Sequence, residues 1–353
     1  MKKWLAMMLV ALVAFGALVG CGKKDESKKE SEATDGKIVV YSNSLTDERE
    51  KFLKEVAAEK GLEIELVGMG GNDLYNRIIA EKDAPIADVV FGMNQILFSQ
   101  IADQDILEAY EPNWLGDVDS DLVAESHLYS PLQEQRVFIV YNKDKMNEAD
   151  VAKDWQDLAN NDKYKGKYIV PDSLGGATAS AIVYNILMNY RDEKGEMGIS
   201  KKGWDQLAKV LSNGKTPSEG QNSIDALANG DADFSYTFLS NVPVVEESLG
   251  IKLGIIDPSY GVPQTVEQVG LIKKDKMNAK AKEFIDFLGS EEVQSEWAKR
   301  YGSAPVNKKA QAATNPRIND ILKMTTPQKN DYKFISKHLS EWVEHIELNL
   351  LGN

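Results

Sequence analysis

The stretch KIVVYSNSLTDEREKFLKEVAAEKGLEIELVGMGGNDLYNRIIAEKDAPIADVVFGMNQILFSQIADQ, residues 37–104, repeats one alternation of patterns three times. Short apolar segments at 37–42, 62–68 and 87–92 each predict a strand. Each is followed by a segment of helical spacing; in the first, Phe52, Leu53, Val56 and Ala57 share one face. Strands that alternate with helices in this way predict a parallel sheet with right-handed crossovers.

Small and amide residues follow each of the three predicted strands, in the segments YSNS (41–44), GMGGND (68–73) and GMNQ (92–95). Such sheets bind their ligands beyond the carboxyl ends of the strands. Ser42, Asn43, Asn94 and Gln95 are therefore predicted to face a polar solute. An amide in this place can equally close an Asx turn and bind nothing.

The middle of the chain repeats the alternation and indicates a second α/β domain. Strands are expected at 136–143, 167–173, 231–238 and 251–258, and helical spacing recurs at 177–191, 202–211 and 222–230. A strand expected at 266–274 is followed mostly by helices, which end in an amphipathic segment at 332–351. The sequence shows no fixed-period repeat, which argues against a solenoid.

The loop VPDSLGGATASAIVYNIL, residues 170–187, has the composition of an anion site. A strand is expected to end before Ser173, two glycines follow, and a helix is expected to begin near Ala177, which leaves backbone N–H groups open for an anion. The predicted contacts are Ser173, Gly175, Gly176, Ala177 and Thr178. The alternative is a glycine turn with a serine cap, and no lysine follows the glycines as it would in a Walker loop.

The segment FSYTFLSN, residues 234–241, places a second set of polar residues at the end of a predicted strand. Tyr236 is predicted to stack on a flat ligand or to donate a hydrogen bond, with Thr237 beside it. The alternative places the Tyr236 ring in the core.

Catalytic motifs are weak in this sequence. Its three histidines, His127, His338 and His345, have no zincin spacing, no Cys/His pair is evident, and the motif G-x-S-x-G does not occur. These observations predict a protein that is not an enzyme and that needs no cofactor.

The single cysteine, Cys21, follows an apolar segment from Leu5 to Val19 that begins after two lysines. The segment is typical of a signal peptide and is short for a membrane span. Residues 18–21, LVGC, resemble a bacterial lipobox, which implies cleavage before Cys21 and a diacylglyceryl group on its sulfur; the alternatives are an ordinary signal peptide and a single-pass anchor. Residues 21–36 carry mixed charge and no large apolar residue, so they are predicted to form a flexible tether.

The formal net charge of −14 argues against nucleic acid as a partner. The simplest explanation of this charge is solubility. The residues after the tether suffice for two domains of ordinary size.

In their order, the segments KIVVYSN, DLYNRIIAEKDAPIADVVFGMNQ, VFIVYNKDK, VPDSLGGAT and ALANGDADFSYTF resemble extracellular solute-binding lipoproteins of ABC importers. More narrowly, they resemble the cluster that holds binders of ferric ion, thiamine, hexose phosphate and aminoethylphosphonate. The resemblance covers nearly the whole chain after the predicted signal peptide.

The resemblance implies an α/β fold of the type II periplasmic-binding-protein class, with two lobes that are each a mixed sheet flanked by helices. Two hinge strands near Phe138–Tyr141 and Val266–Leu271 would join the lobes and let them close on a solute. The implied divisions are a signal peptide at 1–20, the tether at 21–36, lobe 1 at 37–135 and 268–310, lobe 2 at 142–260, and C-terminal helices at 311–353 that pack across the lobes.

The resemblance also implies partners: a small-molecule solute, a permease with its ATPase, and membrane lipid through Cys21. The protein would be a monomer outside the cytoplasm, anchored to the bacterial cell membrane. A lipid-anchored surface hydrolase, or a sensor or adhesin that reuses the fold, is the alternative of another class.

Two differences from the resembling binders limit the class of solute. Ferric binders have two adjacent tyrosines where this chain has Thr237 and Phe238, which argues against direct iron binding and against a metal site. Thiamine binders tend to have bulky residues where this chain has Ser303 and Ala304. The expected solute is therefore a small organic anion such as a sugar phosphate, with a thiamine-like solute and ferric iron as alternatives.

Overall fold

The alternation at 37–104 folds as predicted. The computed structural model describes residues 36–218 and 220–351. Strand β1 pairs in parallel with both β2 and β3. The elements are β1 (Ile38–Ser42), α1 (Asp47–Glu59), β2 (Ile64–Gly68), α2 (Gly71–Ala80), β3 (Val89–Asn94) and α3 (Gln95–Ala102).

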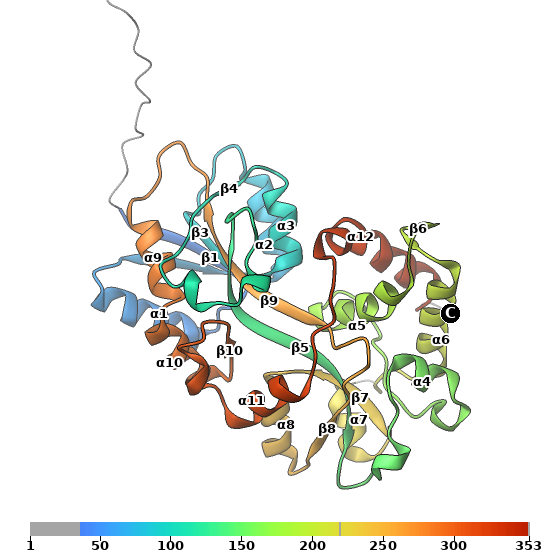
Figure 1. Cartoon of the computed structure of the whole chain (residues 1–353). Helices are drawn as coiled ribbons and strands as arrows, with labels where there is room; N and C mark the ends of the chain where they lie inside the picture. The colour runs from blue at the N-terminus through green and yellow to red at the C-terminus, as the bar shows by residue number, and fades with distance from the viewer. Residues whose placement is uncertain (1–35, 219, 352–353) are drawn as a thin grey trace, which may run out of the picture.

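Two long strands connect this parallel unit to the second half of the molecule. They are β5 (Ser130–Asn142) and β9 (Gln264–Ile272), which run antiparallel to one another. Residues 130–136 of β5 pair with β9, whereas residues 137–141 pair with β7 (Phe234–Phe238). Figure 1 shows β5 and β9 running side by side from the lobe of β1–β3 toward the lobe of β7 and β8. They contain the two stretches predicted as hinges; bending there stays a prediction.

One curved sheet results, with the order β10-β5-β9-β3-β1-β2. Strand β4 (Leu107–Glu108) pairs with β9, and β8 (Leu253–Ile255) pairs with β5. Strand β9 runs antiparallel to β3, and β10 (Ala304–Pro305) runs antiparallel to β5. The sheet is therefore mixed, as predicted.

The helices of the second lobe enclose a core of large aromatic side chains. Trp155, Tyr168, Tyr184 and Phe234 are all buried in it. The elements are α4 (Trp155–Asn160), α5 (Ala177–Leu187), β6 (Arg191–Glu196), α6 (Lys201–Asn213), α7 (Ser223–Asn229) and α8 (Asn241–Leu249).

The strand expected at 167–173 is not a regular strand. Tyr168 and Ile169 make only isolated bridges, to Phe234 and Lys215. Pro171 follows directly, and because proline has no N–H to donate, the pairing cannot continue along the segment.

The last helices return to both halves of the molecule. They are α9 (Lys280–Leu288), α10 (Glu291–Tyr301), α11 (Pro316–Met324) and α12 (Tyr332–Asn349). Gln100 Nε2 of α3 donates to the backbone carbonyl oxygen of Ser336 in α12 at 3.0 Å. Trp342 of α12 donates from Nε1 to the carbonyl oxygen of Met197 in the second lobe, at 3.0 Å. Helix α12 thus lies between the lobes, next to α3 and α5 (Figure 1).

Buried charges fix β5 to the end of α11. The side chains of Glu134 and Arg136 are 14% and 8% exposed and form an ion pair. Arg136 Nη1 also donates to the carbonyl oxygen of Leu322 and to the carbonyl and hydroxyl oxygens of Thr325. Glu134 accepts a second hydrogen bond from Gln264 Nε2 at 2.8 Å.

The first residues of β9 extend beyond the end of β3 and have no strand beside them on that side. Side chains form hydrogen bonds with the backbone of these residues instead. Gln95 Oε1 accepts from the backbone N–H of Val266 at 2.7 Å. The carbonyl oxygen of Gln264 accepts from Tyr332 Oη at 2.7 Å, and from Gln95 Nε2 and Tyr184 Oη at 3.3 Å each. Three helices, α3, α5 and α12, therefore contact β9 at one backbone group.

Among the helices of the described residues, none combines the length and the apolar character that crossing a membrane requires.

Candidate functional site

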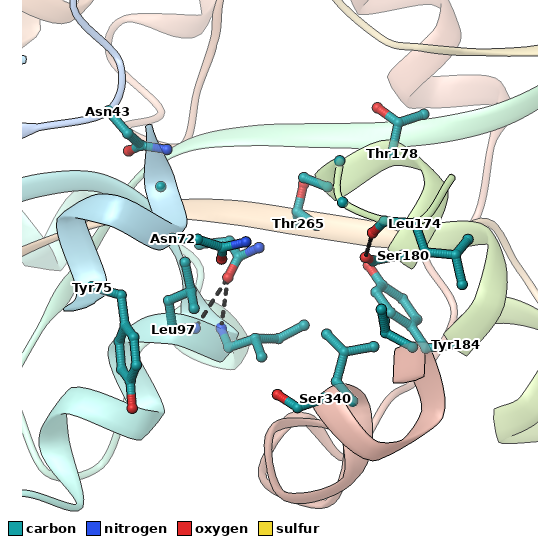
Figure 2. Close-up of a pocket in the computed structure, with 18 of the residues that line it drawn as sticks. Asn43, Asn72, Tyr75, Leu97, Leu174, Thr178, Ser180, Tyr184, Thr265 and Ser340 are labelled. Atoms are coloured by element: carbon teal, nitrogen blue, oxygen red, sulfur yellow. Dashed lines mark hydrogen bonds between the residues drawn. The ribbon is translucent and has the colours of Figure 1, made fainter. Parts of the chain in front are cut away.

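A cleft of about 950 Å³ lies where the two halves of the molecule face one another across the long strands. In Figure 2, Asn43, Asn72 and Tyr75 lie on one side of it, and Leu174, Thr178 and Tyr184 on the other, with Thr265 between them. The lining residues come from the β1–α1 loop, α2, β3, α3, β5, β7, the loop before α5, α5, β9 and α12.

The wall from the first lobe is rich in carboxamides. Asn72 and Asn76 lie in the first turns of α2, Asn43 follows β1, and Asn94 ends β3. Asn94 Oδ1 caps α3, since it accepts from the backbone N–H groups of Ile96 and Leu97 at 3.1 Å each. Amides both donate and accept hydrogen bonds, so this wall suits a polar solute without a net charge on that side.

The opposite wall is formed by the N-terminus of α5. Gly176 is its N-cap in an extended conformation, φ −97° and ψ 147°, and has no side chain to cap the helix. The first bond within the helix is from Ser180 N–H to the carbonyl oxygen of Gly176, so the N–H groups before Ser180 precede the helical hydrogen bonds. Gly176 has nothing within 4 Å of the place where a Cβ would stand. This helix end is open to a hydrogen-bond acceptor in the cleft.

Every charged residue that lines the cleft among the described residues is a glutamate: Glu267 on β9, and Glu344 and Glu347 on α12. Glu347 is exposed and accepts from the backbone N–H of Leu174 at 3.2 Å, just before α5. Glu267 is half-buried; burial raises the pKa of its carboxyl, against the lowering effects of the Ser44 hydrogen bond and of Arg49. The positive potential at the cleft therefore comes from the end of α5, and carboxylates oppose it.

Six of the residues predicted as ligand contacts line the cleft. They are Asn43, Asn94, Gly175, Gly176, Ala177 and Thr178. The helix predicted to begin near Ala177 begins at that residue. Whether these residues bind a solute stays a prediction.

The other five predicted contacts are not among the lining residues. Ser42 is fully buried and accepts from the N–H of Ser44; Gln95 is held by β9. Ser173 is exposed, outside the lining. Tyr236 is half-buried and packs against the core of the second lobe, and Thr237 is buried and accepts from Asn241. The alternating pattern of a strand sends neighbouring side chains to opposite faces, and its end alone does not say which face meets the cleft.

Cleft residues that the sequence reasoning missed come from several elements, among them α3, with Ile96, Leu97 and Gln100, and α5, with Ser180 and Tyr184. Asn72 and Asn76 belong to the segment after β2, where the amide-rich composition could have indicated them. Gln135, Val137, Thr265 and Glu267 lie on the long strands. Leu339, Ser340, Val343, Glu344, Glu347 and Leu348 lie on α12. This helix begins at Tyr332, 145 residues after α5 ends at Leu187, so it carries no local signal for a cleft.

Metal-binding groups do not gather in the described part of the chain: it has no cluster of three or more His, Cys, Asp or Glu side chains that could hold a metal ion. Tyr75 and Tyr184 line the cleft. Burial raises the pKa of Tyr184 well above its ordinary value, and its hydroxyl donates to the carbonyl oxygen of Gln264. Burial therefore disfavours ionisation of that phenol.

Residues 51–325 match the family model described as bacterial extracellular solute-binding protein. A probable ABC transporter periplasmic-binding protein of Sinorhizobium fredii is 29% identical over 313 residues, which cover 89% of this chain and 86% of the relative. An Fe(3+)-binding periplasmic protein of Serratia marcescens is 22% identical and covers 94% of this chain and 95% of its own.

Solved structures confirm the fold prediction. The apo ferric ion-binding protein A of Pasteurella haemolytica superposes with a TM-score of 0.74 at 18% identity, over 90% of this chain and 98% of its own. A periplasmic binding protein of Actinobacillus pleuropneumoniae was solved with exogenous fructose-6-phosphate bound. It superposes with a TM-score of 0.68 at 20% identity, over 91% of this chain and all of its own. The chain has the two-lobed fold of the type II periplasmic binding proteins.

Proposed function

Because the chain belongs to the family of bacterial extracellular solute-binding proteins, we propose that it captures a small solute in its cleft and delivers it to the permease of an ABC importer. The relative from Sinorhizobium fredii, named as a probable ABC transporter periplasmic-binding protein, supports this role. Family members capture solutes, so the proposal includes no catalytic step and no ATPase activity of its own; the ATPase belongs to the importer.

We propose that the solute is a small hydroxyl-rich molecule that carries a phosphate, such as a sugar phosphate. The observation that carries this proposal is the uncapped N-terminus of α5 in one wall of the cleft, facing a wall of carboxamides. Helix N-termini favour phosphate groups, and amides suit hydroxyls. The Actinobacillus pleuropneumoniae protein with bound fructose-6-phosphate shows that this fold can hold such a solute.

The solute can be identified from the protein itself. Small molecules released by denaturing the purified protein would be analysed by mass spectrometry, and a library of phosphorylated metabolites would be screened for a rise in Tm. A phosphorylated compound should be found by both methods, since a ligand that binds only the folded state raises Tm. A hit that lacks a phosphate would contradict the proposed solute class.

A variant of Glu347 can distinguish an anionic solute from a cationic one. Replacing Glu347 with Gln should tighten binding of a phosphorylated solute about two- to fivefold at low salt, because it removes a negative charge beside the end of α5. The glutamine oxygen can still accept from Leu174, so the local structure should persist. Calorimetry at low and high salt checks this; the gain should shrink as salt screens it.

The control for this variant is Glu65→Gln, which removes an exposed carboxylate on β2 and should leave affinity unchanged. Weaker binding in Glu347→Gln would instead indicate a cationic, thiamine-like solute, which three carboxylates in the cleft would favour.

Ferric iron is the second candidate, since the Serratia marcescens and Pasteurella haemolytica proteins are named as ferric binders. We expect no tyrosinate charge-transfer band when the purified protein is titrated with ferric citrate. Burial disfavours ionisation of Tyr184, which leaves Tyr75 as the other tyrosine in the described lining. Tyr236 does not line the cleft, and burial also raises its pKa. A strong visible band that disappears in Tyr236→Phe would restore the ferric proposal.

We also propose that the protein is a monomer anchored to the outside of the bacterial cell membrane by a diacylglyceryl group on Cys21. Cys21 lies outside the described residues, so this proposal rests on the lipobox-like sequence. A diacylglyceryl group supplies the two chains that stable anchoring needs.

A further inference from the structure

Glu267 is a carboxylate in the cleft with only part of its hydrogen-bonding capacity in use. It lies on β9 opposite Asn94 of β3, where the register of the two strands shifts. Ser44 Oγ donates to Glu267 Oε2 at 2.9 Å. Across residues 36–218 and 220–351, the structure contains no other hydrogen bond to this carboxylate. Glu267 lines the cleft, and its Oε1 therefore has unused acceptor capacity.

Gly92 allows Ser44, which donates to Glu267, to lie close to β3. Gly92 on β3 has φ +98°, and a Cβ at that position would stand 2.7 Å from both Asn43 Oδ1 and Ser44 Oγ. Any other residue would therefore displace the Asn43–Ser44 turn from β3. The close approach of this turn to β3 is what positions Ser44 against Glu267.

The cation that acts on Glu267, Arg49, does not neutralise it by direct contact. Arg49 donates from Nη1 to the carbonyl oxygen of Ser44 at 3.0 Å. Its guanidinium lies over the rings of Trp297 and Tyr301, 5.3 and 5.1 Å from their centroids. Arg49 thus attracts Glu267 through space, and the described residues contain no ion pair between the two side chains.

Burial opposes the charge of Glu267 more strongly than Ser44 and Arg49 favour it, and the pKa of the carboxyl is raised as a result. Partial burial of a charge costs free energy unless hydrogen bonds compensate it, and Glu267 is half-buried. A hydroxyl of a solute at Oε1 would offset that cost, and an analogue without the hydroxyl would not. Sites of this kind discriminate strongly between such analogues.

We propose that Glu267 is a specificity-determining acceptor, which binds a hydroxyl of the solute while the phosphate lies at the N-terminus of α5. This inference rests on the proposed function, and it assigns the residue that would recognise the hydroxyl-bearing part of the proposed solute. The carboxamides Asn43 and Asn94 beside Glu267 in the lining suit the same body.

The test compares two probes, fructose 6-phosphate and inorganic phosphate, on the full chain by calorimetry. Replacing Glu267 with Gln should weaken fructose 6-phosphate about tenfold or more and leave inorganic phosphate within about twofold of the wild type. Glutamine can still accept from Ser44, so the variant should fold, and thermal unfolding checks this. Glu65→Gln is the matched control for loss of one negative charge, and both probes should bind it as they bind the wild type.

Two outcomes would overturn the inference, and they differ. If the wild type binds fructose 6-phosphate and Glu267→Gln changes both probes equally or neither, the hydroxyl role is wrong while the proposed solute class stands. If the wild type binds neither probe, the solute class fails and this inference fails with it.

Discussion

Replacing Gly176 with Asp should abolish binding of the phosphorylated solute, with an affinity at least about a hundredfold lower than that of the wild type. The new carboxylate would stand at the N-terminus of α5, where the phosphate is expected. The solute would lose a helix-end interaction of up to about 2 kcal/mol. It would also face a like charge, which costs about 1–4 kcal/mol at 4 Å near a protein surface.

The fold should tolerate this change. The backbone of Gly176 is extended, with φ −97°, and nothing lies within 4 Å of a Cβ there. Aspartate is also a favoured N-cap, so the Tm should stay the same or rise. Calorimetry and thermal unfolding of one preparation therefore separate lost binding from lost structure.

Gly176→Asn is the matched control, because asparagine has nearly the same shape and also caps helices but carries no charge. We expect it to weaken binding by at most about tenfold. Equal affinity in Gly176→Asp and the wild type would show that the loop is only a turn, and the phosphate proposal would lose its main support.

Replacing Arg136 with Met should lower the free energy of unfolding by about 3–5 kcal/mol. Arg136 is the buried partner of Glu134 and the donor to the carbonyl oxygens of Leu322 and Thr325. Methionine fills much of the volume but leaves the Glu134 carboxylate buried with Gln264 as its remaining donor. Denaturant unfolding monitored by tryptophan fluorescence measures the loss.

Arg191→Met is the control for the loss of an arginine. Arg191 pairs with Asp331 at 2.9 Å, but the two side chains are 39% and 45% exposed. Exposed pairs contribute about 0–1 kcal/mol. Similar small losses in both variants would contradict the view that burial makes the Arg136 pair structurally important.

The sequence predicted the fold where local pattern and tertiary structure agree. The three strand–helix units at 37–104 form as expected because β-branched segments and helical spacing occur together with short connections. It placed the beginning of β5 too late, at 136 instead of Ser130. Residues 133–136 are polar and do not look like a strand, but β9 and β10 pair with them and Glu134 and Arg136 neutralise one another.

The cleft could be predicted only in part, for a related reason. Asn43, Asn94 and the residues at 175–178 lie at ends of strands and helices, where the topology itself indicates a site. Gln95 and Tyr236 lie in similar places but face β9 and the core of the second lobe. Glu347 and Glu267 depend on how distant segments pack, which no local pattern encodes.

The carbonyl oxygen of Gln264 has two lone pairs but three donors, from α3, α5 and α12. The three donors thus share the two lone pairs, at unequal distances of 2.7, 3.3 and 3.3 Å. If the long strands bend as predicted, the loss of one of these donors would still leave this oxygen with a hydrogen-bond partner. The position of β9 at Gln264 therefore depends on no single one of these three side-chain hydrogen bonds.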